Sequence, residues 1–404
     1  MKDSLLSRNG RNYLAPFVLI TSLFFLWGFA HSILDVLNKH FQVVLDIGKA
    51  QSALVQAAVY GGYFLMALPA GEIIRRRGYR FGVLTGLALY GFGALMFVPG
   101  SYLMSFPFFI ASLFIIGCGL TCLETAANPY VTELGAPSAA ERRINLAQSF
   151  NGLGWMVGPL VGGLLLFDGS ETGGNIALPY VIIGVAVWVV AGLFYRVELP
   201  EPAEAQPAAA ADEAAAAGGL WSRPHFALGV VALLLYVAAQ TGINSFFINF
   251  AEENSPLTAR DASLVLSFGC MGLFLVGRMA GSWLMKYVRP VRLVLVLALG
   301  AMATMLGVTF VGGWAGLALF LLCYLCESVM FPTLFALSIA GLGQQTKRAS
   351  SFLIMSIVGG AIAPVGMGLV ADCFGCMQPA FFIPALCFFG IAAYCSAYGR
   401  LKRA

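Results

Sequence analysis

Three acidic residues lie inside long apolar stretches of the chain. Glu124 is the only charged residue of segment 81–132, and Glu327 is the only one of segment 293–346. Asp35 lies toward the far end of the first apolar stretch. A charge at the centre of a bilayer costs at least about 2.5 to 3.5 kcal/mol on insertion scales, so each of these carboxyl groups requires an explanation if the stretches cross a membrane.

Proton transfer is the chemistry that such carboxyl groups can perform. Removal from water favours the neutral form, so Glu124 could hold a proton and release it near physiological pH. If its span reaches Phe41, Asp35 lies about 9 Å below the outer end and could load a proton from external water. The alternative is that each carboxyl group pairs with a neighbour or with backbone donors and only holds helices together, and this alternative is strongest for Glu327. We therefore predict proton coupling for Asp35 and Glu124.

Neutral amides accompany the acids within the apolar stretches. Asn128 lies one helical turn after Glu124. Gln148 and Asn151 are three residues apart, and Gln240 and Asn244 are four residues apart, so each pair shares one helix face. Such groups suit a hydroxylated ligand, although amides also join membrane helices to one another. Together with Glu327, they form the predicted substrate-binding group: Asn128, Gln148, Asn151, Gln240, Asn244 and Glu327.

The composition requires an apolar solvent. The 404 residues are 59% hydrophobic and 10% charged, with a mean hydropathy of +0.85, whereas a soluble domain is about one quarter charged. No P-loop, HExxH or GxSxG pattern occurs in a suitable setting. The net charge of +4 comes without a basic face for nucleic acid. We therefore expect a membrane protein that is not an enzyme and that has no cofactor, no metal site and no nucleic-acid partner.

Twelve apolar runs are long enough to cross a bilayer as helices. An Ala-, Pro- and acid-rich segment, 198–223, separates six of them from the other six and is predicted to be a flexible cytoplasmic linker. The sequence thus predicts an all-α membrane protein with one six-helix bundle in 1–197 and another in 224–404. The expected spans are 15–41, 51–74, 80–99, 106–133, 144–167, 177–196, 225–251, 260–285, 290–311, 314–341, 347–371 and 378–400.

Charge distribution and repetition give the orientation and the class of protein. With the N-terminus inside, 20 of the 23 Lys and Arg lie on cytoplasmic segments or adjoining span ends, and only Lys39, Lys49 and Arg260 do not. Both termini are therefore expected in the cytoplasm. Glu124 and Glu327 each stand five residues before a proline, at an offset that a duplicated six-span unit would give. Such duplication is typical of secondary transporters.

Six segments resemble the fucose-proton symporter family of the major facilitator superfamily. They are LFFLWGF (23–29) with Asp35, ETAANPY (124–130), NLAQSFN (145–151), GRMAG (277–281), FPT (331–333) and KRASSF (347–352). The resemblance implies the fold of that superfamily, with twelve helices in two pseudo-symmetric halves. It also implies that Asp35 and Glu124 are the family's two membrane carboxyl groups, and that Gln148 and Asn151 are its polar positions on span five.

The chain departs from the family pattern at two places. Segment 71–80 resembles the superfamily's gating loop and gives Gly71, Arg76, Gly78 and Arg80 as gating candidates, but Arg75 stands where many members have Asp. His31 and Ser32 stand where the fucose carriers have amides that help to set sugar selectivity, so we include both among the substrate-binding candidates. His31 could handle protons or could only hydrogen-bond within the bundle.

The expected function is proton-coupled import of a monosaccharide, such as L-fucose or a related hexose, by alternating access of the two halves. The expected setting is a bacterial inner membrane, with the lipid bilayer, the sugar and the proton as partners and a monomer as the functional unit. Three alternatives stay open: a sugar facilitator or drug exporter on the same fold, a sugar sensor that binds without transporting, and a membrane-embedded enzyme.

Overall fold

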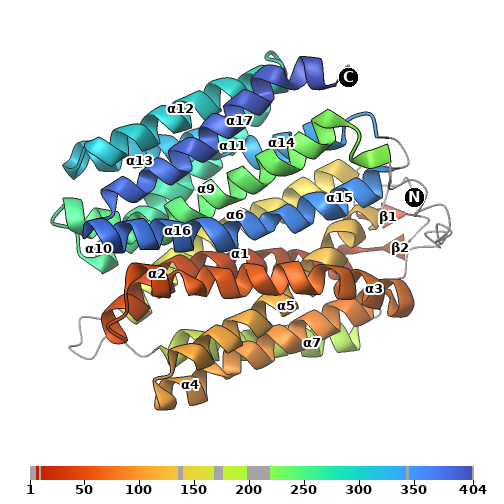
Figure 1. The fold of residues 1–404 in the computed structure, drawn as a ribbon. Helices are drawn as coiled ribbons and strands as arrows, with labels where there is room; N and C mark the ends of the chain where they lie inside the picture. The colour runs from red at the N-terminus through yellow and green to blue at the C-terminus, as the bar shows by residue number, and fades with distance from the viewer. Residues whose placement is uncertain are drawn as a thin grey trace. The chain divides into compact units, whose positions relative to one another are not determined.

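The computed structural model describes residues 6–8, 11–134, 140–167, 176–197, 219–342 and 345–402, nearly all of them helical (Figure 1). Within these ranges, eleven stretches are long and apolar enough to cross a membrane. The contacts divide the chain into two compact units. Unit 1 comprises Met1–Leu45 and Ala58–Ala205, and unit 2 comprises Asp46–Ala57 and Gln206–Ala404. The predicted linker lies outside the described residues from 198 to 218, and its boundaries stay a prediction.

Unit 1 is a bundle of long helices preceded by a two-residue antiparallel ladder, β1 (Ser7–Arg8) with β2 (Arg11–Asn12). Large apolar side chains such as Leu65 and Leu68 are exposed on its helices, as lipid-facing surfaces require. Its helices are α1 (Leu14–Val44), α3 (Leu54–Leu95, from residue 58 onward), α4 (Phe97–Leu103), α5 (Phe106–Glu133), α6 (Ala140–Leu166) and α7 (Ala177–Arg196).

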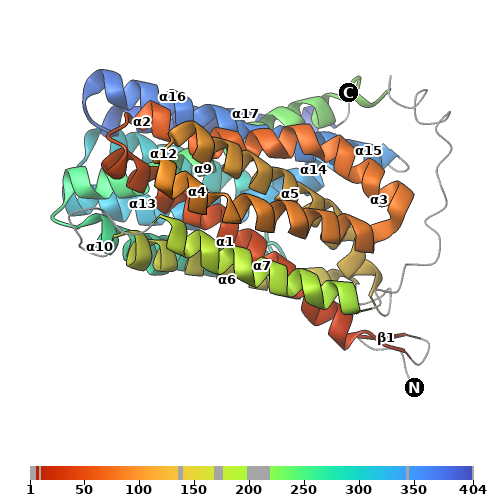
Figure 2. The same cartoon turned by 90° about the horizontal axis from the view of Figure 1, so that it is seen from below.

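Gly78 reverses the chain within α3. Its φ of +82° is a conformation that a side chain would strain. The ribbon of α3 turns back on itself in both views (Figures 1 and 2). The two spans expected around segment 71–80 are therefore present as the two arms of α3. They form part of one continuous 55-residue stretch, Lys49–Leu103, and this explains why eleven stretches are found where twelve spans were expected.

Unit 2 contains the remaining helices. Pro224 and Pro290 lie in the first turns of α9 and α12, where proline fits because the first helical N–H groups have no partner. The elements are α2 (Lys49–Ser52), α9 (Pro224–Asn254), α10 (Ala259–Leu264), the π-helix η2 (Val265–Cys270), α11 (Met271–Leu284), α12 (Pro290–Phe310), α13 (Gly313–Glu327), α14 (Met330–Ile339), α15 (Thr346–Met355), η4 (Ser356–Val358), α16 (Gly359–Phe374), η5 (Gln378–Phe381) and α17 (Phe382–Leu401).

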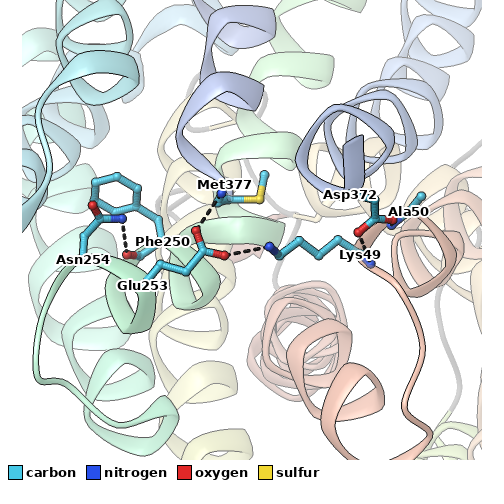
Figure 3. Close-up of polar contacts among 7 residues, drawn as sticks. All are labelled: Lys49, Ala50, Phe250, Glu253, Asn254, Asp372 and Met377. Atoms are coloured by element: carbon cyan, nitrogen blue, oxygen red, sulfur yellow. Dashed lines mark hydrogen bonds and ion pairs between the residues drawn. The ribbon is translucent and has the colours of Figure 1, made fainter. Parts of the chain in front are cut away.

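Segment 46–57 belongs by its contacts to unit 2, although it follows α1 in sequence. The carboxylate of Asp372, on α16, accepts hydrogen bonds from the backbone N–H groups of Lys49 (3.0 Å) and Ala50 (2.9 Å) (Figure 3). A Cβ atom at Gly368 would lie 2.5 Å from the Cα of Ala50, so only glycine permits this approach. Segment 46–57 is therefore fixed to α16 both by hydrogen bonds and by close backbone packing.

Candidate functional site

The centre of the candidate site in unit 1 is the hydroxyl group of Tyr63, on α3. It lies 3.0 Å from Nε2 of His31, on α1. It is also a side-chain hydrogen-bond partner of Glu124, on α5, and of the Trp27 indole, on α1. Glu124 is half-buried, and His31 is only 6% exposed. Three helices thus bring a carboxyl group, a phenol and an imidazole into one hydrogen-bonded chain.

Aromatic rings enclose His31. The ring of Trp155, on α6, stacks on the imidazole with 6.0 Å between centroids and 11° between planes. Tyr60 lies at 5.6 Å and Tyr63 at 5.4 Å from the same ring. Nδ1 of His31 is buried and has no hydrogen-bond partner among the described residues. A buried polar nitrogen without a hydrogen-bond partner costs free energy, and a polar ligand atom bound at Nδ1 among the aromatic rings would remove that cost.

The other candidates of unit 1 flank this chain. Asp35 is 2% exposed and lies one helical turn beyond His31 on α1. Asn128 lies one turn after Glu124 on α5, and its Oδ1 is buried without a hydrogen-bond partner in the part of the chain that the structure describes. Gln148, on α6, is half-buried. Their direct involvement with a substrate stays a prediction.

Ser32 and Asn151 hold α1 against α6. The Ser32 hydroxyl donates to the Gly154 carbonyl (3.2 Å), and the Asn151 amide donates to the Phe24 carbonyl (3.1 Å). Glycines allow this approach, since a Cβ at Gly158 would lie 1.9 Å from the Ser32 Oγ. In these contacts the polar groups join two helices. This is the role that the sequence left open as the alternative to ligand binding.

Unit 2 holds the second group of polar candidates. Asn244, on α9, is 2% exposed, and its Oδ1 lacks a partner among the described residues. Gln240, one turn earlier, is half-buried. Glu327 is fully buried, and neither of its carboxyl oxygens has a hydrogen-bond partner within the described ranges. The pairing with a neighbour or with backbone donors that the structural alternative requires for the Glu327 carboxyl group is therefore not formed within these ranges.

Glu327 is the last residue of α13, where the helix breaks before α14 begins at Met330. The break has a local cause, because Pro332 has no N–H to give to the carbonyl of Ser328 four residues earlier. Nε of Arg278, on α11, donates to that carbonyl at 3.3 Å. The Tyr236 hydroxyl donates to the Glu327 backbone carbonyl at 3.2 Å. Interrupted helices of this kind form the binding sites of many secondary transporters.

The gating candidates lie around the reversal of α3. Glu72 pairs with Arg75 (Nη2 to Oε1, 2.6 Å) and with Arg76. Arg80 donates to the carbonyl of Tyr195, at the end of α7. Gly71 has open space where a Cβ would be placed, so only Gly78 is required as glycine by the backbone here. Arg75 thus takes part in a local cation–carboxylate cluster.

The sequence indicated no role for Tyr63 or for Arg278, although Arg278 lies in the GRMAG segment (277–281). Tyr60 and Tyr63 are three residues apart and share a helix face, and this spacing is the signal that could have drawn attention to Tyr63. The positions of Tyr63 and Arg278 in the sequence do not reveal their hydrogen-bond partners, because those partners lie on other helices. No group of three or more His, Cys, Asp or Glu suited to a metal ion occurs among the described residues, and all nine cysteines are free thiols.

Comparison with known proteins places the whole chain among transporters. The family model described as Major Facilitator Superfamily matches residues 17–364. The chain is 38% identical to the L-fucose-proton symporter of Escherichia coli (strain K12), over 94% of this chain and 92% of that protein. It is 33% identical to a glucose/galactose transporter of Brucella abortus, over 95% of this chain and 94% of that protein.

Solved structures agree with these relatives. The crystal structure of a major facilitator superfamily transporter, FucP, in the outward conformation matches with a TM-score of 0.71 and 38% identity, over 96% of this chain and 99% of that chain. The D-xylose-proton symporter matches with a TM-score of 0.78 at 13% identity, over 94% of this chain and 96% of that chain. The second match is a likeness of fold alone.

Proposed function

The chain belongs to the major facilitator superfamily, and from this premise we propose that it is a proton-coupled symporter that imports a monosaccharide. The relatives named for L-fucose–proton symport and for glucose or galactose transport support a hexose or 6-deoxyhexose as the sugar. The observation that carries the proposal is the hydrogen-bonded chain from Glu124 through Tyr63 to His31. It puts a carboxyl group next to the aromatic rings that surround His31, within one bundle.

The coupling follows from differential affinity. Protonation and sugar binding must favour the same conformational change, because a ligand shifts an equilibrium only by its difference in affinity between the states. Neutralising Asp35 and Glu124 removes charge that otherwise resists closure of the site. The inward drive is about 1.4 kcal/mol per pH unit plus about 2.3 kcal/mol per 100 mV for each proton.

The remaining roles follow from the sequence. We assign the polar residues around these acids to sugar binding and the segment 71–80 to gating, and we expect the bundles 1–197 and 224–404 to move as bodies about the linker. The sugar-binding set is His31, Ser32, Asn128, Gln148, Asn151, Gln240, Asn244 and Glu327. We expect a monomer in a bacterial inner membrane with both termini in the cytoplasm, and no catalysis.

Uptake into proteoliposomes tests the proposal. With an inward proton gradient, the wild-type protein should accumulate L-fucose, D-glucose or D-galactose, and a protonophore should abolish the accumulation. Asp35→Asn and Glu124→Gln should lose accumulation while retaining exchange of sugar for sugar. Unchanged accumulation in both variants would reject the assignment of proton coupling, and uptake that ignores the gradient would identify a facilitator.

A further inference from the structure

The hydrogen-bond capacity of Tyr63 limits how its three neighbours can be arranged. A phenol donates one hydrogen bond and accepts two. The Trp27 indole N–H is a donor only, so it occupies one of the two acceptor positions. Of the remaining neighbours, His31 and Glu124, one must donate to the Tyr63 oxygen and the other must accept its hydrogen. Only two arrangements satisfy this condition.

The first arrangement requires a proton on Glu124. Only a protonated Glu124 can donate its O–H to Tyr63, so that the Tyr63 O–H donates to Nε2 of His31 and the neutral imidazole carries its hydrogen on Nδ1. When Glu124 is ionised, it can only accept, so Tyr63 donates to it and His31 must donate from Nε2. Nδ1 of a neutral imidazole then has no hydrogen.

We propose that Tyr63 couples Glu124 to His31, so that His31 presents a hydrogen-bond donor at Nδ1 to the substrate only when Glu124 holds a proton. This inference rests on the proposed function and adds the device by which the proton controls sugar recognition. A sugar oxygen that can only accept, such as the ring oxygen, would bind at Nδ1 in the protonated state and would meet a lone pair in the ionised state.

The hydrogen-bonded chain of Glu124, Tyr63 and His31 can also carry a proton, with every bond accounted for. Loss of one proton at Nδ1 of His31, transfer of the Tyr63 hydrogen to Nε2 and transfer of the Glu124 hydrogen to the Tyr63 oxygen convert the first arrangement into the second. Only O–H and N–H bonds form and break, and no other reactant is required. Nδ1 is thereby the point at which the proton of Glu124 enters or leaves.

The surroundings of the chain leave this arrangement intact. Within six residues of His31, Tyr63 or Glu124 on their own helices, the other titratable groups are Asp35 on α1, Tyr60 on α3, and Cys118, Cys122 and Tyr130 on α5. Trp155, which faces His31 from α6, does not titrate. No ion pair involves His31 or Glu124 among the described residues, so the donors and acceptors of Trp27, Tyr63, Glu124 and His31 decide the outcome.

Nitrogen NMR of histidine tests the inference without a substrate. The chain has three histidines, so ¹⁵N-histidine labelling together with a His31→Asn sample assigns the signals of His31. In the wild-type protein, the His31 hydrogen should move from Nδ1 to Nε2 as the pH rises. Tyr63→Phe should abolish that movement. Tyr90→Phe is the matched control, because the buried hydroxyl of Tyr90, also on α3, donates to the carbonyl of Leu26.

Two results would overturn the inference: a His31 tautomer that does not change with pH in the folded wild-type protein, or a change that persists in Tyr63→Phe. A second measurement uses whichever of L-fucose, D-glucose and D-galactose the protein accumulates. The dissociation constant of that sugar should rise with pH in the wild-type protein and become nearly independent of pH in Tyr63→Phe. Failure of uptake with an intact tautomer change would reject the proposed function and keep the coupling of the three side chains.

Discussion

The ammonium group of Lys49 lies 2.7 Å from the Oε1 atom of Glu253, near the end of α9, and joins α2 to that helix (Figure 3). Oε2 of Glu253 accepts the backbone N–H of Met377 at 2.6 Å, so one carboxylate holds two segments. The Lys49 and Glu253 side chains are 18% and 27% exposed, and an exposed pair contributes only about 0.2 to 1 kcal/mol. The attachment of segment 46–57 to unit 2 therefore combines this weak ion pair with the two hydrogen bonds to Asp372.

Removal of the Asp372 carboxylate should release segment 46–57. Asp372→Ala deprives two backbone N–H groups of a charged acceptor, and each such bond contributes about 1.5 to 3 kcal/mol at most. Hydrogen exchange measured by mass spectrometry should therefore speed up about tenfold or more across residues 46–57. Cys373→Ala changes the adjacent, exposed side chain and serves as the control. Equal exchange in the two variants would show that Asp372 does not hold the segment.

The parts of the fold that depend on local composition could be predicted from the sequence. Long apolar runs reveal the spans, and a single acid in segment 81–132 is conspicuous because nothing else there is charged. The spans expected at 51–74 and 80–99 are the two arms of α3, which the non-helical backbone of Gly78 separates.

The parts of the sites that depend on contacts between helices could not be predicted. Tyr63 becomes functional only because α1 and α5 bring His31 and Glu124 to its hydroxyl. Asn151 and Ser32 were predicted to bind sugar, which stays a prediction, and the structure shows that they join α1 to α6. Sequence spacing gives the face of one helix but does not give the helix that it meets.

The approach of α1 to α6 predicts a packing defect on enlargement of Gly158. Gly158→Ala would place a methyl group 1.9 Å from the Ser32 Oγ and 2.9 Å from the Ile33 backbone nitrogen. Overpacking of this kind costs about 1 to 3 kcal/mol, so the protein should unfold at a lower temperature in detergent. The loss should be smaller in a Ser32→Ala background, where one of the two clashes is absent. Gly192→Ala, at an exposed helical position with open space, should be neutral or stabilising. Equal melting of the two alanine variants would contradict the close approach.

Glu327 should be expendable for stability but not for transport. Its buried carboxyl oxygens have no hydrogen-bond partner in the described part of the chain, and an apolar side chain of similar size would remove that cost. Glu327→Met should therefore raise the free energy of unfolding, by about 1 to 3 kcal/mol, and reduce proton-driven sugar uptake. Glu327→Ala should lower stability because it leaves a cavity. A destabilised methionine variant with normal uptake would instead support a purely structural role.

The hydrogen bond from Arg278 to the helix break predicts that Pro332→Ala should reduce the loss of stability caused by Arg278→Gln. Arg278→Gln should weaken the donor to the Ser328 carbonyl, and an unsatisfied buried carbonyl costs about 1 to 3 kcal/mol. Pro332→Ala should supply a backbone N–H four residues after Ser328 and allow α13 and α14 to join. In that background, Arg278→Gln should cost less, and a double-mutant cycle of thermal unfolding measures the difference. Because the joined helix would lose the break beside Glu327, the Pro332→Ala variant should be stable but slow in sugar uptake. Additive effects of the two substitutions on stability would show that Arg278 does not compensate for the proline.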